Sequence, residues 1–399
     1  MRRRILIFCD FYLPGFKSGG GMWMVANLVE RFSDRYDFYI VTRNYDSKGD
    51  RRPYTTVKTN EWNDVGPARV FYFGKGELTV AKTAEIVAGV RPDAIYLNSA
   101  FSLPVRQFLR GRRRGTTADV PVILAPCGEM AEGALSVKPL KKRVFLKLAL
   151  ASNLYRDVIW KASFEAEATE IKRVMGPDVE VHVAADLAPR TILSDFDESI
   201  KPSKEKGEVR LTYFSRVVPK KNLKYLLESL TEIHDGRVAL DIIGPLEDRQ
   251  YWSECQQVIA RMPENVRVTV AGTFADQRDA LLRLAESHFF AMPTLNENFG
   301  YVFLEALAAG CPLLISDRTV WTDIEAKGVG WRVPLGDHAT YVGRIREYID
   351  MTGSEYLEMS RRARNYAEAW LANDETEAAN AQVLDIALSR SGRQTSVSA

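Results

Sequence analysis

The chain has 399 residues, of which 46% are hydrophobic and 27% charged, and a formal net charge of +2. This composition is typical of a globular protein in water, and the length suits two or three domains. A membrane-spanning helix is not expected, because no apolar run approaches the roughly 20 residues that cross a bilayer. The cysteines have no paired spacing, which favours a cytoplasmic location over a disulfide framework or a zinc site (Cys9, Cys127, Cys255, Cys311).

The near-neutral total hides an uneven distribution of charge. Residues 1–195 carry 30 basic and 22 acidic side chains, whereas residues 196–399 carry 24 and 30. Basic clusters at residues 2–4, 110–114 and 138–143 are either solvated faces or attract an anionic partner, such as a membrane surface or a lipid diphosphate. Nucleic acid ranks last, because no basic motif with interleaved aromatic residues is present.

Short apolar runs and a helical pattern alternate through the first half. Residues 5–8, 38–42, 94–97 and 120–125 have the pattern of buried strands, and residues 25–32 have that of a helix. Such alternation predicts βαβ units around a parallel sheet.

Two loops that follow these strands are candidates for ligand contact. The first, residues 11–21, ends in Gly19, Gly20 and Gly21, which let the backbone approach a ligand closely. The alternative is a flexible surface turn, and a dinucleotide fingerprint is a poor match. The second loop contains Glu129, a candidate for contact with an acceptor or a sugar.

Two further segments have less regular patterns. Residues 141–160 mix basic and apolar side chains; they are expected to form a core-facing helix, and the alternative is a segment that docks on a membrane surface. Residues 195–208 are polar, as expected of a linker between domains. Asp195 and Asp197 lie in this linker rather than at a strand end, so both carboxylates are expected to be solvated and not to bind a metal.

A second alternation begins after the linker. Five segments have the pattern of strands (residues 209–214, 238–243, 266–270, 289–292 and 313–316). Asn222 is expected to cap a helix with apolar positions at Leu223, Leu226, Leu227, Leu230 and Ile233. Helical patterns return at residues 338–350, 354–372 and 375–390, and the tail, residues 391–399, is expected to be disordered.

Charged residues gather at two strand-to-helix junctions of the second half. Arg216 and Lys221 follow the strand that ends at residue 214. Glu297 lies in the loop before an apolar helix, and Glu305 lies in the first turns of that helix. Open α/β sheets bind ligands at the carboxyl ends of their strands, and a helix N-terminus favours a phosphate group.

Residues 294–312 resemble the signature of the retaining family-four glycosyltransferases. Seven residues separate Glu297 from Glu305, and Ala-Leu-Ala-Ala-Gly-Cys-Pro follows. Arg216 and Lys221 match the family's basic pair, although Ser215 stands where glycine is usual. The resemblance covers nearly the full length and implies the α/β GT-B fold, in which two Rossmann-like domains have parallel sheets that face each other across a cleft.

The resemblance also implies a division into domains. Residues 1–194 would form the acceptor domain, and residues 209–372 would form the nucleotide-sugar domain, with the linker at residues 195–208 between them. A last helix, residues 373–390, would pack back on the N-terminal domain.

The resemblance assigns roles at the site by position. Glu297 would bind hydroxyls of the donor sugar, Arg216 and Lys221 the leaving diphosphate, and Glu305 the ribose hydroxyls. Backbone N–H groups of Asn298, Phe299 and Gly300 would face the sugar. Backbone N–H groups of Tyr301 and Val302 would face the diphosphate. The base would be bordered by Gly244, Gly272, Thr273 and Phe274. The glycine loop at residues 19–21 would lie near the donor phosphates and the acceptor.

One departure concerns histidine. Many relatives place a histidine beside the donor sugar in the N-terminal half, but the first histidine here is His182. That role is therefore absent or passes to another group such as Glu129.

The resemblance implies transfer from a nucleotide sugar, with retention of configuration and without a metal or other cofactor. Trp321 and residues 327–332 resemble those of bacterial enzymes that build cell-surface polysaccharides, so a glycan or polyprenyl-diphosphate-linked acceptor at the inner face of the plasma membrane is expected. Two alternatives remain: a nucleotide-sugar epimerase of the same architecture, and a non-catalytic paralogue that binds a nucleotide sugar.

Overall fold

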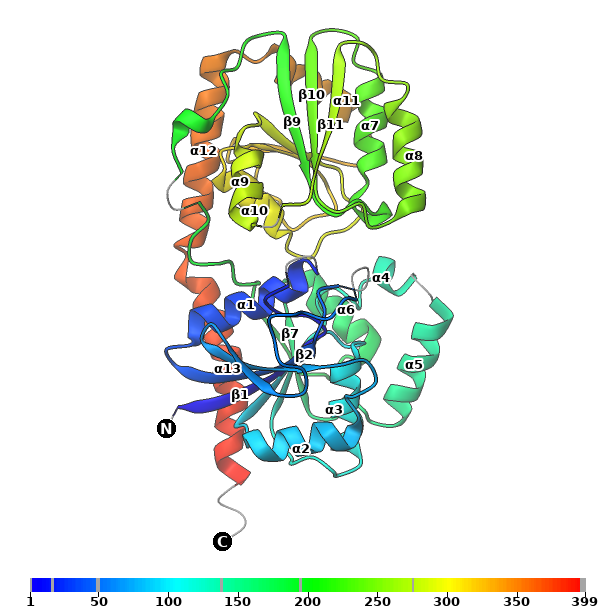
Figure 1. Ribbon diagram of the computed structural model, residues 1–399, viewed down its shortest axis with the longest axis vertical. Helices are drawn as coiled ribbons and strands as arrows, with labels where there is room; N and C mark the ends of the chain where they lie inside the picture. The colour runs from blue at the N-terminus through cyan, green and yellow to red at the C-terminus, as the bar shows by residue number, and fades with distance from the viewer. Residues whose placement is uncertain are drawn as a thin grey trace. The chain divides into compact units, whose positions relative to one another are not determined.

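The computed structural model describes residues 2–15, 18–47, 51–136, 139–193, 196–274 and 276–394. It divides into two compact units, one made of Met1–Arg190 with Asn373–Ala399 and the other of Thr191–Ala372 (Figure 1). Among the described helices, none is both long and apolar enough to cross a membrane.

Unit 1 has a sheet flanked by helices. Its strands run in the order β3-β4-β2-β1-β5-β6-β7-β8, and only β3 pairs in the antiparallel sense among the strands described. The strands are β1 (Arg3–Phe8), β2 (Tyr36–Arg43), β3 (Trp62–Val65), β4 (Ala68–Phe73), β5 (Ala94–Asn98), β6 (Val122–Ala125), β7 (Val158–Ala162) and β8 (Val181–Val183). The helices are α1 (Gly20–Phe32), α2 (Val80–Val90), α3 (Leu103–Arg113), α4 (Glu132–Ser136), α5 (Pro139–Ala151), α6 (Glu165–Met175) and α13 (Asp374–Gln394).

Both faces of this sheet are buried, as β1 illustrates. Ile5 and Ile7 join a hydrophobic cluster with α1 and α13, whereas Leu6 and Phe8 join a second cluster with α2 and α3. Since successive strand residues point to opposite faces, a continuous apolar run is required where helices cover both faces. This is why residues 5–8 are apolar throughout.

Helix α13 completes unit 1 from the far end of the chain. Val383, Leu384, Ala387 and Leu388 are at most 8% exposed within the cluster that contains Ile5. Asn380 donates to the carbonyl of Ala185 at 2.8 Å. The helix continues to Gln394, past the predicted start of a disordered tail at residue 391, and residues 395–399 lie outside the described part of the chain.

Unit 2 is built around a parallel sheet with the strand order β11-β10-β9-β12-β13-β14. The strands are β9 (Glu208–Phe214), β10 (Arg237–Ile243), β11 (Val266–Gly272), β12 (Phe289–Met292), β13 (Leu313–Ser316) and β14 (Gly330–Val333). The helices are α7 (Leu223–Thr231), α8 (Arg249–Ile259), α9 (Gln277–Ala285), α10 (Tyr301–Ala308), α11 (His338–Asp350) and α12 (Gly353–Leu371), with short 3-10 turns at Glu198–Ile200 and Pro219–Lys221. The apolar positions predicted for α7 are fully buried, as expected of its core-facing stripe.

The polar segment predicted as a linker is packed against unit 2. The ammonium of Lys201 donates to the carbonyls of Ser287 (2.6 Å) and Ala309 (3.1 Å). Lys204 is 6% exposed and donates to the carbonyl of Met351 at 2.8 Å. The segment therefore belongs to unit 2, which begins at Thr191, whereas the sequence predicted a division after residue 194. Composition alone does not reveal these lysine contacts.

Two other segments differ from expectation. Residues 141–160 do not form one helix, because α5 ends at Ala151 and Trp160 lies in β7, where it is 1% exposed. Helix α1 begins at Gly20, earlier than the pattern suggested, so Gly20 and Gly21 lie in its first turn and not in the preceding loop. Burial of Met22 and Met24 favours this longer helix despite its glycines.

Candidate functional site

The predicted donor residues of unit 2 lie at the carboxyl ends of neighbouring strands. Strand β9 lies between β10 and β12, so the strand order reverses beside it. Arg216 follows β9, and Glu297 follows β12. The two motifs therefore meet at the switch point where open α/β sheets bind ligands.

An ion pair between Lys221 and Glu297 joins the two motifs. The two side chains are 12% and 13% exposed. Burial by itself raises the pKa of Glu297, but Lys221, Lys220 and Arg216 together hold this pKa below its ordinary value. The carboxylate of Glu297 is thus kept ionised near neutral pH by the basic side chains around it.

Backbone contacts fix the two loops against each other. The carbonyl of Lys220 accepts from the amide of Leu295 (2.9 Å) and the hydroxyl of Thr294 (3.1 Å). Asn222 precedes α7 as expected, but its side chain does not cap that helix and donates instead to the carbonyl of Pro293 at 2.9 Å. These bonds set the position of Lys221 relative to Glu297.

Arg216 has a carboxylate partner of its own. Its guanidinium donates to Glu247, in the loop after β10, at 2.9 Å, and the two side chains are 36% and 30% exposed. Such a half-exposed pair is worth little energy. Glu247 therefore orients the guanidinium of Arg216, but an anionic ligand could replace this carboxylate at little energetic cost.

The N-terminus of α10 lies beside Glu297. Its cap residue is Gly300, at φ 78°, and no side chain caps the helix. A Cβ at position 300 would lie 2.8 Å from Cγ of Glu297 and 2.6 Å from the ring of Phe303, so only glycine fits this turn. The N-terminal end of a helix carries a partial positive charge that favours an anion, and in α10 this end is formed by Tyr301 and Val302.

Glu305 lies one turn further along α10 in a different environment. Its carboxyl group accepts from the amide of Gln277, on α9, at 2.8 Å. Burial raises the pKa of Glu305 to about 7, because the hydrogen bond from Gln277 offsets only part of the desolvation. Unlike Glu297, this group changes its charge near neutral pH.

Aromatic side chains support the loop between Glu297 and α10. The indole N–H of Trp321 donates to the carbonyl of Phe299 at 2.7 Å. The ring of Phe299 contacts Trp321 and Trp370, with centroids 5.5 and 5.0 Å apart. Trp370 belongs to the last turn of α12, so this helix helps to hold the loop in place.

The segments expected to border a base follow β10 and β11. The amide of Gly244 donates to the carbonyl of Gly272 at 2.7 Å. A Cβ at position 244 would lie 2.2 Å from the carbonyl oxygen of Ser215, so glycine is needed where the ends of β9 and β10 converge. Thr273 and Phe274 continue from β11 at the same end of the sheet.

In unit 1, the carboxyl group of Glu129 is already bound. It accepts from the hydroxyl of Ser99 (2.8 Å) and from the amides of Ala100 (2.6 Å) and Phe101 (3.3 Å). Burial raises its pKa, partly against these hydrogen bonds. The contacts hold the loop after β5, a role that the sequence did not suggest.

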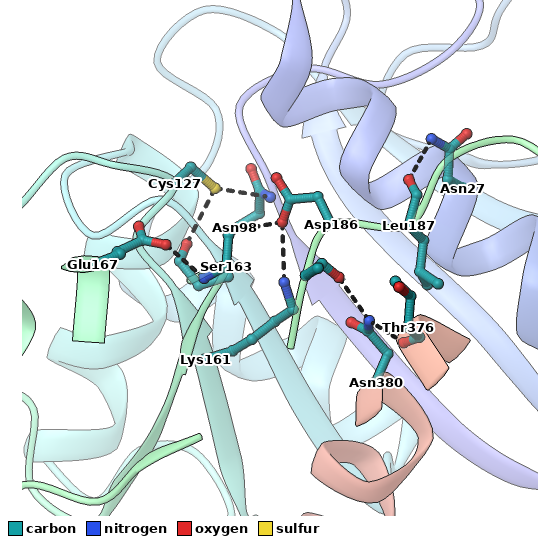
Figure 2. A network of polar contacts seen from close by, with 12 residues as sticks. Asn27, Asn98, Cys127, Lys161, Ser163, Glu167, Asp186, Leu187, Thr376 and Asn380 are labelled. Carbon is teal, nitrogen blue, oxygen red and sulfur yellow. Dashed lines mark hydrogen bonds and ion pairs between the residues drawn. The ribbon is translucent and has the colours of Figure 1, made fainter. Parts of the chain in front are cut away.

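A buried polar network lies at the carboxyl ends of β5, β6 and β7 (Figure 2). Lys161 and Asp186 form an ion pair at 3.1 Å with 2% and 4% of the side chains exposed. Ser163 donates its hydroxyl to Asp186 at 2.7 Å and its amide to Glu167 at 2.7 Å. Breaking such a pair leaves an uncompensated buried charge, so we interpret the network as structural.

The predicted glycine loop lies in the same unit. Gly19 caps α1 with φ 79°, and a Cβ at Gly21 would lie 3.6 Å from the side-chain oxygen of Asn98. The amide of Asn98 in turn contacts the sulfur of Cys127 at 3.5 Å (Figure 2). The start of α1 is thus near the carboxyl end of β5.

Within the described residues, no group of three or more His, Cys, Asp or Glu side chains could hold a metal ion. Asp197 caps the 3-10 turn at Glu198–Ile200 by accepting from the amide of Ser199 at 2.9 Å. Asp195 lies outside the described residues.

Comparison with known proteins identifies the domain that carries the donor candidates. Residues 195–370 match the family "Glycosyl transferases group 1". This segment, most of unit 2, is similar to the group 1 glycosyltransferases. A phosphatidyl-myo-inositol mannosyltransferase from Mycobacterium leprae is 30% identical over 125 residues, which are 30% of this chain and 32% of that protein. The match thus spans about a third of the length of this relative.

Solved structures show the fold of the whole chain. Anabaena HepE, in complex with UDP and glucose, has a TM-score of 0.66 at 17% identity, covering 96% of this chain and 99% of that one. Sucrose-phosphate synthase from Thermosynechococcus elongatus has a TM-score of 0.67 at 16% identity, covering 100% of both chains. The predicted GT-B fold is confirmed.

Several contacts at the candidate donor site of unit 2 were missed from the sequence. Three contacting residues belong to no recognisable motif: Glu247 contacts Arg216, Gln277 contacts Glu305, and Trp370 contacts Phe299. Glu247 and Gln277 share one signal in the sequence, because both follow the carboxyl end of a predicted strand (β10 and β11). Trp370 has no such signal, because its contact with Phe299 spans 71 residues of chain.

Proposed function

We propose that this protein transfers a sugar from a nucleoside-diphosphate sugar to an acceptor hydroxyl. The observation that carries the proposal is the ion pair between Lys221 and Glu297, formed at the strand switch point beside the N-terminus of α10. HepE, whose structure contains UDP and glucose, has the same fold and supports this choice of donor.

The leaving diphosphate needs cations and N–H donors, because negative charge grows on it as its bond to the anomeric carbon breaks. Arg216 can bind phosphate oxygens bidentately, and Lys221 adds a point charge. The N–H groups of Tyr301 and Val302 would add the favourable end of the helix dipole. Since Arg216 pairs with Glu247 without a ligand, the diphosphate would compete with this carboxylate.

The two glutamates would bind different parts of the donor. Glu297, held ionised by its cationic neighbours, would accept hydrogen bonds from hydroxyls of the sugar, with backbone groups of Asn298, Phe299 and Gly300 beside it. Glu305 would accept from the ribose hydroxyls. The base would contact the backbone at Gly244 and at residues 272–274.

The proposed reaction retains configuration and uses no metal. The bond from the anomeric carbon to the diphosphate breaks, and a bond to the acceptor oxygen forms on the same face. The acceptor proton passes to an oxygen of the leaving phosphate, so neither Glu297 nor Glu305 acts as a nucleophile. Arg216 and Lys221 would supply the positive charge that a metal gives in other transferases.

The proposed acceptor is a glycan or a polyprenyl-diphosphate-linked sugar used in cell-surface polysaccharide synthesis at the cytoplasmic face of the membrane. The name of the mycobacterial relative specifies a lipid substrate, which supports a lipid-linked acceptor. Unit 1 would supply the acceptor contacts, including the turn at Gly19, Gly20 and Gly21. Glu129 would act there by holding the loop after β5, because three donors occupy its carboxyl group.

A nucleotide screen tests the donor site. UDP, GDP and ADP are added with and without EDTA, and the melting temperature and tryptophan fluorescence are recorded. Ligand binding to the native state raises the melting temperature by mass action, and Trp321 and Trp370 contact the donor loop through Phe299. We expect one diphosphate to change both signals, with or without EDTA.

Arg216→Ala should abolish these changes. Arg237→Ala is the matched control, because Arg237 forms a comparable exposed ion pair with Glu208 (2.9 Å) at the amino end of β10. If no nucleotide changes either signal, the proposal fails and a non-catalytic role is favoured. If the bound nucleotide sugar is converted to an epimer without any acceptor, the protein is an epimerase and not a transferase.

A further inference from the structure

Helix α5 presents an unusual surface to solvent. Leu140, Val144, Leu148 and Leu150 are 76%, 49%, 65% and 41% exposed, and they are four of the nine large hydrophobic side chains found exposed in the described part of the chain. Leu140, Val144 and Leu148 are four residues apart, so they form one continuous stripe on the helix. We call these three residues the α5 stripe.

The opposite side of α5 accounts for its attachment to unit 1. Leu146 and Ala149 are buried in the core, and the ring of Phe145 contacts Phe101 with centroids 5.6 Å apart. Lys142 donates to the carbonyl of Ala134 at 2.5 Å. The helix is therefore anchored by its inner face, while the α5 stripe stays exposed among the residues that the structure describes.

Basic side chains flank the stripe. Lys141, Arg143 and Lys147 are exposed, and the helix contains no acidic residue. An apolar stripe bordered by lysine and arginine is the pattern of a helix that lies in the plane of an anionic membrane surface. The helix of 13 residues would offer about 20 Å of contact along the surface.

We propose that the α5 stripe docks unit 1 on an anionic lipid bilayer. Leu140, Val144 and Leu148 enter the boundary between headgroups and acyl chains, and Lys141, Arg143 and Lys147 contact lipid phosphates. A second copy of the chain fits this surface less well, because a symmetric contact would bring the same cations together with no carboxylate on either helix. The stripe also lacks the aromatic anchors that are typical of protein interfaces.

Flotation with lipid vesicles tests this docking. The full chain is mixed with vesicles of phosphatidylcholine alone or of an equal mixture with phosphatidylglycerol, and the floating fraction is measured. We expect flotation with the mixed vesicles, little with phosphatidylcholine alone, and a steep loss as salt is added. The assay needs neither nucleotide nor acceptor, so its failure leaves the proposed transferase function untouched.

Two variants and two controls locate the contact. The triple variant Leu140→Ser, Val144→Ser, Leu148→Ser should lower the partition coefficient by about tenfold for each residue. Replacing Lys141, Arg143 and Lys147 by Gln should lower it by about fivefold for each charge. Leu357→Ser, at a 43% exposed leucine of unit 2, and Lys172→Gln, at an exposed lysine of α6, should leave flotation unchanged. All four proteins should melt like the wild type, since the altered side chains are exposed.

Three results would overturn the proposal. The first is a wild-type chain that does not float with the mixed vesicles. The second is a triple serine variant that floats as well as the wild type. The third is a wild-type dimer in sedimentation that this variant converts to a monomer, because the α5 stripe would then be an interface between copies.

Discussion

At the scale of single residues, the two glutamates of the predicted signature differ in charge state. Glu297 has three cations around it and a lowered pKa, whereas Glu305 has a neutral amide and a pKa raised to about 7. The spacing in the sequence predicted both positions but neither environment. The difference arises because Glu297 faces the loop after β9 and Glu305 faces α9.

Glu305 should make stability depend on pH. The folded protein holds the proton of Glu305 more tightly than the unfolded chain, so its contribution to the free energy of unfolding is full below about pH 4.5 and is lost as pH rises through about 7. The side chain introduced by Glu305→Gln stays neutral at every pH, so the variant does not lose this stability as pH rises. At pH 8.5 the variant should be more stable than the wild type by about 2 kcal/mol, measured by urea unfolding.

Glu297→Gln is the matched comparison for this prediction. Because the pKa of Glu297 is lower in the folded protein than in the unfolded chain, its carboxylate stabilises the fold at pH values above the unfolded pKa. This contribution is lost as pH falls through the folded pKa. The Glu297→Gln variant should therefore be destabilised at neutral pH. If the free energy of unfolding changes with pH in the same way for the wild type and for Glu305→Gln, the raised pKa assigned to Glu305 is wrong.

At the scale of elements, the turn into α10 depends on one glycine. Gly300 and Gly272 have the same φ of 78°, but a Cβ clashes only at position 300. Gly300→Ala should therefore combine backbone strain with displacement of Glu297 and cost about 3 kcal/mol, whereas Gly272→Ala should cost about 1 kcal/mol from strain alone. Denaturant unfolding measures both values, and equal costs would exclude the predicted clash.

The helices differ in how well the sequence predicted them. The apolar stripe of α7 was predicted correctly, because burial at every third or fourth residue leaves a periodic pattern. The segment at residues 141–160 was predicted as one helix, but it divides into α5 and β7. Leu148 and Leu150 are exposed in α5, whereas Trp160 is buried in β7, and this difference depends on the segments that surround each side chain.

At the scale of the whole molecule, each unit has its own core, and α13 belongs to unit 1 although the whole of unit 2, Thr191–Ala372, separates it from Arg190 in the sequence. Leu384→Ala should lower the free energy of unfolding of unit 1 by about 3 kcal/mol, because it opens a cavity in the cluster around Ile5. Leu226→Ala should do the same for unit 2. Scanning calorimetry should show a lowered transition for the altered unit and an unchanged one for the other.

A Leu384→Ala variant that lowers both transitions equally would contradict this assignment and indicate a single cooperative unit. In that case the boundary after Arg190 would have no thermodynamic meaning.

The α/β class, the GT-B fold and the positions of Arg216, Lys221, Glu297 and Glu305 could be predicted from the amino-acid sequence alone. This was possible because strand and helix periodicity and the signature at residues 294–312 are local patterns. Which groups pair depends on the folded chain: Lys221 with Glu297, Arg216 with Glu247, Glu305 with Gln277, and Glu129 with the loop after β5. These pairings join segments far apart in the chain, and the pKa of each carboxyl group depends on the burial and charge that such distant segments provide.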